Sequence, residues 1–108
     1  MDTYIQVVTT VEEEKDAQTI ATALLNRRVA ACIQIAGPIT SHYWWKGKID
    51  QASEYMCIIK SRDDMYDLVE AIIKSVHPYE VPEIIATPIV DGSKDYLQWI
   101  DTELNSKE

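Results

Sequence analysis

The sequence predicts an α+β fold in the order β-α-β-β-α-β, followed by a C-terminal helix. Apolar residues recur at helical spacing in two segments, and stretches rich in β-branched and aromatic residues flank both of them. The two β-α-β halves also repeat one pattern, as a split β-α-β fold requires. With 108 residues, of which 46% are hydrophobic, the chain has room for one core. We therefore expect a single domain over residues 1–108.

The first strand and the first helix are predicted near the N-terminus. Residues 4–10 are rich in side chains that favour a strand. Thr10 and Glu13 have the form of a capping box, which indicates that a helix begins directly after Thr10. Arg27 and Arg28 suit the C-terminal end of this helix. Its apolar stripe consists of Ala17, Ile20, Ala21, Leu24 and Leu25.

A long hairpin is predicted next. Residues 31–46 look extended, Gly37-Pro38 marks a bulge or bend, and residues 46–48 supply the turn. The return strand alternates Tyr55, Cys57 and Ile59 with Met56, Ile58 and Lys60. Fully extended at ~3.3 Å per residue, residues 31–46 would reach roughly 50 Å, whereas a chain of this size has a radius of gyration near ~13 Å. Part of the hairpin must therefore bend or project.

The outer end of the hairpin carries Tyr43, Trp44 and Trp45, so that both faces of the strand are aromatic. Leaving these rings in water would create an adhesive patch. We expect another subunit to bury them, and the alternative is that both tryptophans pack within the small core of one chain.

The second half of the fold begins with a helical stripe over residues 65–76, opened by Ser61 or Asp63 and closed before Pro78. Residues 84–90 read as a fourth strand, and Pro88 argues that this strand lies at a sheet edge or bulge. A short helix follows from about residue 93. Its apolar side consists of Tyr96, Leu97, Ile100 and Leu104.

Composition narrows the classes of partner. The net charge of −8 opposes nucleic acid binding, because the overall field repels phosphate backbones. No apolar run approaches the ~20 residues of a membrane helix, and residues 1–3 show no secretory signal, so we expect a cytoplasmic protein that does not enter the membrane. Cys32 and Cys57 match no zinc or haem spacing and read as buried free thiols.

Several segments match one protein family along almost the whole chain. They are Ala30-Ala31-Cys32, residues 41–49, Glu54 with Ile59-Lys60, residues 77–84 (His-Pro-Tyr-Glu-Val-Pro-Glu-Ile), and residues 96–99 (Tyr-Leu-Gln-Trp). In these segments the sequence resembles the CutA divalent-ion tolerance proteins. The resemblance implies a ferredoxin-like subunit in a tight homotrimer of PII-like architecture, associated with tolerance to copper and other divalent cations. No catalytic reaction is established for the family, so the resemblance implies a protein that is not an enzyme.

The resemblance also bears on metal binding. Some bacterial members have a copper site made of one cysteine and two histidines, and these positions align to Thr9, Val76 and His77. Threonine and valine cannot replace a thiolate or an imidazole. We therefore expect copper(II) or another divalent cation to bind weakly, through His77 with Glu80 or Glu83. The alternative for His77 is a structural role at the end of the second helix.

The remaining candidates are aromatic. Tyr79, Tyr96 and Trp99 are expected to line a pocket between subunits or to pack, and His42 is expected at the surface or the interface. The alternative function is a PII-like small-ligand sensor or scaffold trimer without direct metal binding. Nucleotide sensing would need a glycine-rich phosphate loop, which the sequence lacks. An acylphosphatase-like arginine and a Cys-x-x-Cys are likewise missing from the loop after the first strand, where they would be needed.

Overall fold

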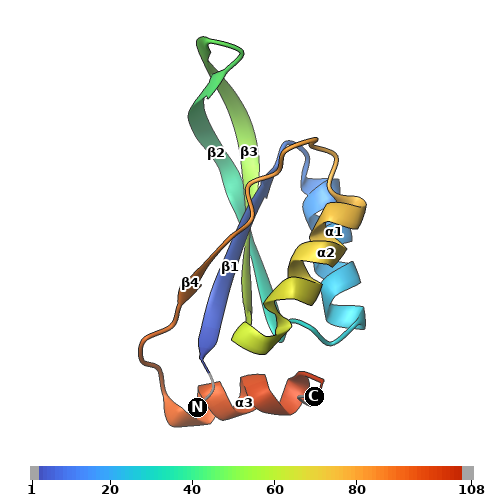
Figure 1. Cartoon of the computed structure of the whole chain (residues 1–108), viewed down its shortest axis with the longest axis vertical. Coiled ribbons are helices and arrows are strands. Elements are labelled where there is room, and N and C mark those ends of the chain that lie inside the picture. Colours follow the sequence, from blue (N-terminus) through green and yellow to red (C-terminus); the bar gives the residue numbers. More distant parts are fainter. Residues whose placement is uncertain (1–2, 106–108) are drawn as a thin grey trace.

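The computed structural model describes residues 3–105, which form one four-stranded antiparallel sheet and three α-helices (Figure 1). The strand order is β2-β3-β1-β4. Met1 and Asp2, where the sequence predicts no secretory signal, lie outside the described residues. The elements are β1 (Tyr4–Val11), α1 (Glu14–Asn26), β2 (Cys32–Trp45), β3 (Lys48–Arg62), a short 3-10 helix (Asp63–Met65), α2 (Tyr66–Val76), β4 (Ile85–Pro88) and α3 (Lys94–Glu103). This order confirms the predicted βαββαβ fold with a C-terminal helix.

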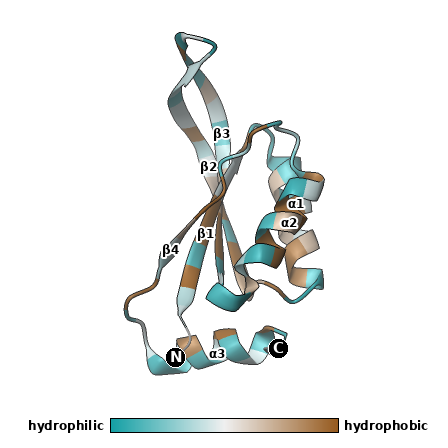
Figure 2. Ribbon diagram, viewed as in Figure 1, coloured by the Kyte–Doolittle hydropathy of each residue, from teal (hydrophilic) through white to brown (hydrophobic). Residues whose placement is uncertain are grey.

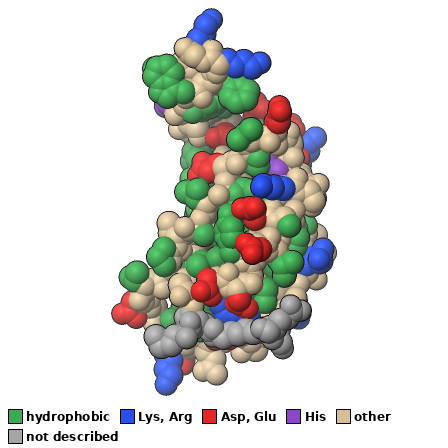
Figure 3. Space-filling view, in the orientation of Figure 1, with side chains coloured by type: hydrophobic (Ala, Val, Ile, Leu, Met, Phe, Trp, Pro, Cys, Tyr) green, Lys and Arg blue, Asp and Glu red, His purple; other side chains and the backbone are tan. Residues whose placement is uncertain are grey.

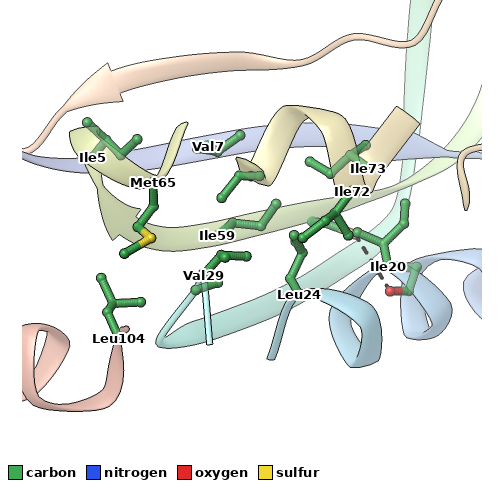
Figure 4. Close-up of a cluster of buried hydrophobic side chains, with 14 of the residues drawn as sticks. Ile5, Val7, Ile20, Leu24, Val29, Ile59, Met65, Ile72, Ile73 and Leu104 are labelled. Atoms are coloured by element: carbon green, nitrogen blue, oxygen red, sulfur yellow. Dashed lines mark hydrogen bonds between the residues drawn. The ribbon is translucent and has the colours of Figure 1, made fainter. Parts of the chain in front are cut away.

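The core lies between the sheet and helices α1 and α2, which cover one of its faces. Leu24 of α1, Ile73 of α2, and Val7 and Ile59 of the two central strands are completely buried there, as Figure 4 shows. Fully burying a side chain of this kind contributes roughly 1.5–3 kcal/mol. The hydrophobic positions of α1 and α2 therefore point at the sheet, while their outer surfaces are largely hydrophilic (Figure 2).

The predicted start of α1 is wrong, and so is one of the two alternatives predicted for the start of α2. Thr10 does not cap α1, because β1 continues through Val11 in register with β3; α1 begins at Glu14, and its cap residue Glu13 makes no side-chain capping bond. Ser61 does not open α2 either. It lies in β3, where its hydroxyl donates to the carbonyl of Val29 at 2.6 Å. The alternative, Asp63, begins the 3-10 helix that leads into α2.

The fourth strand is shorter than residues 84–90. It covers only Ile85–Pro88, although the amide of Ile89 still donates to the carbonyl of Tyr4 at 2.8 Å. The predicted position of Pro88 at a sheet edge is confirmed, since β4 pairs with β1 alone.

The hairpin of β2 and β3 projects well beyond the helices, so that the molecule measures 44 Å along its longest axis (Figure 1). At the predicted bulge, Gly37 and Pro38 interrupt the register between Ala36 and Ile39. At the tip, Lys46 and Gly47 both have positive φ angles, 50° and 79°, as a tight primed hairpin turn requires. Residues 39–54, beyond the bulge, are called the outer hairpin below.

The outer hairpin has no core of its own. Trp44 is 73% exposed and Trp45 is 50% exposed, and hydrophobic side chains stand on its surface in Figure 3. The alternative that both tryptophans pack within the core of one chain is therefore wrong. The physical reason is distance, because the bulge directs these residues past the ends of the helices that would cover them.

The sheet face away from α1 and α2 is mixed in polarity and incompletely covered. Cross-strand partners share a face, and the register aligns Gln34, Ile58, Val8 and Ile85 across all four strands. Ile58 and Val8 are half-buried, and Ile85 is 53% exposed. This surface, called the open face below, combines that largely apolar row with a polar row that contains Gln6, Lys60 and Thr87, and residues 3–105 do not fully bury it.

Helix α3 crosses the end of the sheet opposite the hairpin tip (Figure 1). The hydroxyl of Ser93 accepts from the amide of Tyr96 at 3.2 Å and caps the helix. Arg62, whose side chain is almost completely buried, donates to Asp64, to Asp101 at 3.0 Å and to the carbonyl of Asn105 at 3.0 Å. Arg62 thus ties the C-terminal helix to the end of β3.

The two cysteines are free thiols, as predicted. Cys57 is buried, and burial raises its pKa to about 11, so it is an unreactive thiol at neutral pH. Cys32 is only half-buried, so the prediction that it is buried is wrong for this residue; it lies in β2 at one side of the sheet.

Candidate functional site

An open cavity of about 740 Å³ lies where the outer hairpin leaves the body of the protein. Three segments form it: the end of β1, the outer hairpin, and the loop between α2 and β4. The hairpin register places Ser41, Tyr43, Asp50, Ala52 and Glu54 on one face. The other lining residues are Thr10, Glu12, His42, Trp44, Trp45, Tyr79, Val81 and Glu83.

Glu54 is the most buried carboxylate of this cavity, with only 7% of its surface exposed. It lies beside the bulge, opposite Ile39. The phenol of Tyr79 donates to its Oε2 at 2.7 Å. None of the ion pairs among residues 3–105 involves Glu54, so one phenol and the solvent at the cavity mouth are left to stabilise its charge.

The pKa values of two tyrosines in the cavity reflect its negative charge. Burial, the hydrogen bond to Glu54 and the charges of Glu54 and Glu12 raise the pKa of Tyr79. Burial and the charges of Asp50, Glu54 and Glu12 raise the pKa of Tyr43. Both phenols therefore stay neutral at physiological pH, and the cavity carries a negative potential.

His77 holds the loop that supplies Tyr79. Its Nε2 lies 2.9 Å from the carbonyl oxygen of Thr10, and its Nδ1 accepts the amide hydrogen of Tyr79 at 3.1 Å. Because a carbonyl only accepts and an amide only donates, the imidazole is the neutral tautomer with hydrogen on Nε2. Burial lowers the pKa of His77, outweighing the opposing effects of Thr10, Asp16 and Glu54.

This geometry bears directly on the predicted metal ligands. Both ring nitrogens of His77 already have partners, and the partner at Nε2 is a strand carbonyl rather than the end of α2. Glu83 lines the cavity, whereas Glu80 is exposed and does not. Within residues 3–105, no three His, Cys, Asp or Glu side chains lie close enough together to hold a metal ion. His77, Glu80 and Glu83 are therefore not assembled into a metal site within one chain.

The predicted aromatic residues fall into two groups. Tyr43, Trp44, Trp45 and Tyr79 line the cavity, and Tyr79 also packs against His77 with 4.8 Å between ring centroids.

Tyr96 and Trp99 lie on α3 at the opposite end of the molecule, where their ring centroids are 5.5 Å apart. The structure thus does not bring these two residues together with the hairpin aromatics in one chain.

Sequence reasoning did not assign Glu12, Asp50 or Glu54 to the site. The contact between Tyr79 and Glu54 joins residues 25 positions apart, which no periodic pattern reveals. The one available signal was the position of Glu54 directly before the regular alternation of β3, where a charged side chain next to buried positions indicates a special environment.

Comparison with known proteins identifies the class. Residues 5–103 match the family described as CutA1 divalent ion tolerance protein. The chain is 44% identical over 91 residues to Protein CutA of Homo sapiens, covering 84% of this chain and 51% of that protein. It is 39% identical over 94 residues to the divalent-cation tolerance protein CutA of Thermus thermophilus, covering 87% and 91%. The chain thus spans about half the length of the human relative and most of the bacterial one.

Solved structures agree in fold. CutA1 from Oryza sativa superposes with a TM-score of 0.94 at 34% identity, covering 97% of this chain and 96% of that one. CutA1 from Shewanella sp. SIB1 gives 0.92 at 41% identity, covering 95% and 96%. The chain therefore belongs to the CutA1 divalent ion tolerance family. A similar structure from Archaeoglobus fulgidus is titled a periplasmic protein, and no helix within residues 3–105 has the length and apolar character to cross a membrane.

Proposed function

We propose that this chain acts in cellular tolerance of copper and other divalent cations as a homotrimer, without catalysing a reaction. The family membership supports the role in cation tolerance, since the curated bacterial relatives carry that function in their names. Two incompletely covered surfaces support the assembly: the row of Val8, Ile58 and Ile85 on the open face, and the aromatic side chains of the outer hairpin. Of these, the exposed Trp44 at the end of a projecting hairpin is the observation that carries the proposal.

Assembly with closed symmetry would bury both surfaces. Strand edges and apolar sheet faces that stay in water promote uncontrolled association, whereas closed symmetry buries them in a limited number of copies. An outer hairpin that leaves its own core can pair with, or pack on, a neighbouring subunit. The free thiols Cys32 and Cys57 fit a reducing compartment, which favours the cytoplasm as the proposed location.

Direct cation binding through His77 is proposed to be weak. A metal ion at His77 must displace either the Thr10 carbonyl or the Tyr79 amide, and Glu80 and Glu83 offer only hard oxygen ligands. Isothermal titration with copper(II) near neutral pH is expected to show weak binding that His77→Ala removes. Tight stoichiometric binding that survives His77→Ala would show that another site carries the metal.

The tolerance role itself is testable in cells that lack their own CutA-type protein. The native chain is expected to restore growth on copper, and a variant unable to assemble, such as Trp44→Ala with Trp45→Ala, is expected to restore it less well. If the native chain restores no growth, or if a monomeric variant restores it fully, the proposal fails.

A second candidate function is a small-ligand sensor or scaffold trimer with no direct metal binding. The observation that favours it is the cavity of about 740 Å³, together with the engaged nitrogens of His77. Full cellular copper tolerance in the absence of measurable copper binding by the purified protein would favour this candidate over direct binding.

A further inference from the structure

The loop between β4 and α3 contains the one Asp-Gly dipeptide of the sequence, Asp91-Gly92. Both residues are exposed, and neither belongs to a helix or a strand. The loop lies near the end of the molecule opposite the tip of the outer hairpin (Figure 1). The carboxyl group of Asp91 is folded back on the main chain, because the amide of Gly92 donates to its Oδ1 at 2.9 Å. The nitrogen that could react with this carboxyl group is therefore already beside it.

An aspartyl side chain in this position can form a succinimide with the main chain. The amide nitrogen of the next residue bonds to Cγ of the protonated carboxyl group, and the carboxyl hydroxyl leaves with the amide proton as one water molecule. Water then opens the five-membered ring. Cleavage of the new bond to Cγ restores aspartate. Cleavage of the bond to the main-chain carbonyl carbon gives isoaspartate, in which the main chain passes through Cβ and Cγ. The sequence of steps needs no oxidant, reductant or cofactor.

Gly92 favours ring closure in two ways. Glycine lacks a Cβ, which leaves the main chain around its nitrogen free to rotate and uncrowded. The amide of Gly92 also forms no main-chain hydrogen bond among residues 3–105. The fold explains why a glycine stands here, since a Cβ at position 92 would lie 3.2 Å from Cδ2 of Leu97, which would have to shift. Packing against α3 thus retains the residue that makes the dipeptide reactive.

Asp50-Gln51 provides a contrast within the same chain. The amide of Gln51 donates to Oδ1 of Asp50 at 2.8 Å, so the side chain is folded back in the same way, and both residues are exposed. Both lie in β3, however, where they pair with Tyr43 and His42 of β2. Strand pairing holds the main-chain dihedral angles that ring closure must change, and the Cβ of Gln51 crowds the ring. We therefore expect Asp50 to react far more slowly than Asp91 in the folded protein.

The position of Asp91-Gly92 gives its conversion a structural consequence. Immediately after it, the hydroxyl of Ser93 caps α3 by accepting from the amide of Tyr96 at 3.2 Å. Immediately before it, the amide of Ile89 donates to the carbonyl of Tyr4 at 2.8 Å. Only residues 90–92 join these two anchored points. Isoaspartate lengthens the main chain of this short link by one carbon atom, which shifts Ser93 relative to the helix that it caps.

We propose that Asp91-Gly92 is a modification site, at which the folded protein converts to isoaspartate and thereby loosens the first turn of α3. The inference goes beyond the proposed function and depends neither on cation binding nor on the oligomeric state. The product carries a main-chain carboxylate of the kind that isoaspartyl methyltransferases accept as substrate.

Incubation of the native protein in heavy-oxygen water tests the proposal, because each opening of a succinimide incorporates one labelled oxygen that peptide mass spectrometry can locate. The buffer is mildly acidic, so that more of the carboxyl group is protonated, and circular dichroism verifies that the fold persists. We expect label to accumulate about tenfold or more faster at Asp91 than at Asp50, as a modest difference in activation free energy produces. Methylation by an isoaspartyl methyltransferase should then measure the isoaspartate formed at Asp91.

The same incubation in guanidinium chloride separates the effect of the fold from that of the dipeptide sequence. Unfolding releases Asp50 from its strand, so its labelling should speed up about tenfold or more, whereas labelling of Asp91 should change less than about threefold. Asp91→Glu is the matched control, since it keeps the charge but would need a six-membered ring. It should abolish both label and methylation at this position. Hydrogen exchange at the amide of Tyr96 should become faster in the aged native protein but not in equally aged Asp91→Glu.

Two results would overturn the assignment of the site: equal labelling of Asp91 and Asp50 in the folded protein, or suppression of labelling by folding that is as strong at Asp91 as at Asp50. Unchanged protection of Tyr96 in protein whose isoaspartate has been verified by methylation would overturn the effect on α3.

Discussion

The body of the protein and the outer hairpin use the same strands in opposite ways. In the body, β3 contributes Cys57 and Ile59, both completely buried beneath α1 and α2. Beyond the bulge the same strand contributes Ile49, which is 67% exposed. The body therefore contains its own core, whereas the outer hairpin carries apolar and aromatic side chains that one chain leaves exposed.

This contrast separates what stabilises the fold from what is left for function. A two-stranded ribbon is at best marginally stable in water without a surface to pack on. The outer hairpin nevertheless keeps a regular register from Ile39 to Trp45. Its exposed aromatic rings and the acidic cavity at its base do not contribute to the core of the body. The account predicts that changes in the two regions have different consequences.

The largest effect is expected from the aromatic end of the hairpin. Trp44→Ala and Trp45→Ala each remove a ring from the proposed interface, and loss of a buried tryptophan costs about 3–5 kcal/mol. The secondary structure of the body should persist in circular dichroism while the trimer dissociates. Leu68→Ala, at an exposed position on α2, is the control and should leave assembly unchanged. If both tryptophan variants remain trimeric with unchanged melting, the interface assignment is wrong.

Two isoleucines of β3 provide a direct comparison of the regions. Ile59→Ala creates a cavity in the core and should lower the free energy of unfolding by about 2–5 kcal/mol. Ile49→Ala should affect unfolding less, and its effect should show as weaker assembly. Urea titrations at two protein concentrations distinguish these cases. If the two substitutions lowered the free energy of unfolding equally, the proposed difference between the body and the outer hairpin would be wrong.

Substitution of Arg62, which attaches α3 to the body, is expected to have an intermediate effect on the free energy of unfolding. Arg62→Met keeps much of the side chain's length but leaves Asp64 and Asp101 without their shared cation. Because both carboxylates are partly exposed and can be hydrated, we expect a loss of about 1–3 kcal/mol rather than the larger cost of a fully buried pair. Hydrogen exchange should show α3 opening first. Unchanged protection of α3 would contradict this role of Arg62.

The smallest effect concerns pH. The fold holds His77 neutral and lowers its pKa, so below about 6.5 the unfolded chain binds a proton that the folded chain does not. Stability from this residue is therefore present above that pH and is lost as the pH falls through and below it. The melting temperature of the native protein should fall more steeply between neutral and mildly acidic pH than the melting temperature of the His77→Gln variant. Parallel pH profiles would show that His77 does not titrate in this way.

The sequence predicted the body better than the site, for physical reasons. Apolar periodicity is local and strong in Ala17 to Leu24 and in Val69 to Ile73, so both helices were correctly placed. The predictions that Thr10 and Ser61 begin helices failed, because both residues have capping side chains but are held in strands by long-range pairing. The partners of His77 and Glu54 could not be predicted, because hydrogen bonds to Thr10 and Tyr79 join segments that meet only in the folded chain.

The measurement that tests the central claim most directly is the molar mass of the native protein in solution. Size-exclusion chromatography with light scattering, at micromolar concentration and neutral pH, should give the mass of three chains of 12.3 kDa each. Such a trimer would bury the outer hairpin and the open face together. A stable, folded species with the mass of one chain would contradict the account, because Trp44 and the open face would then remain in water with no partner to cover them.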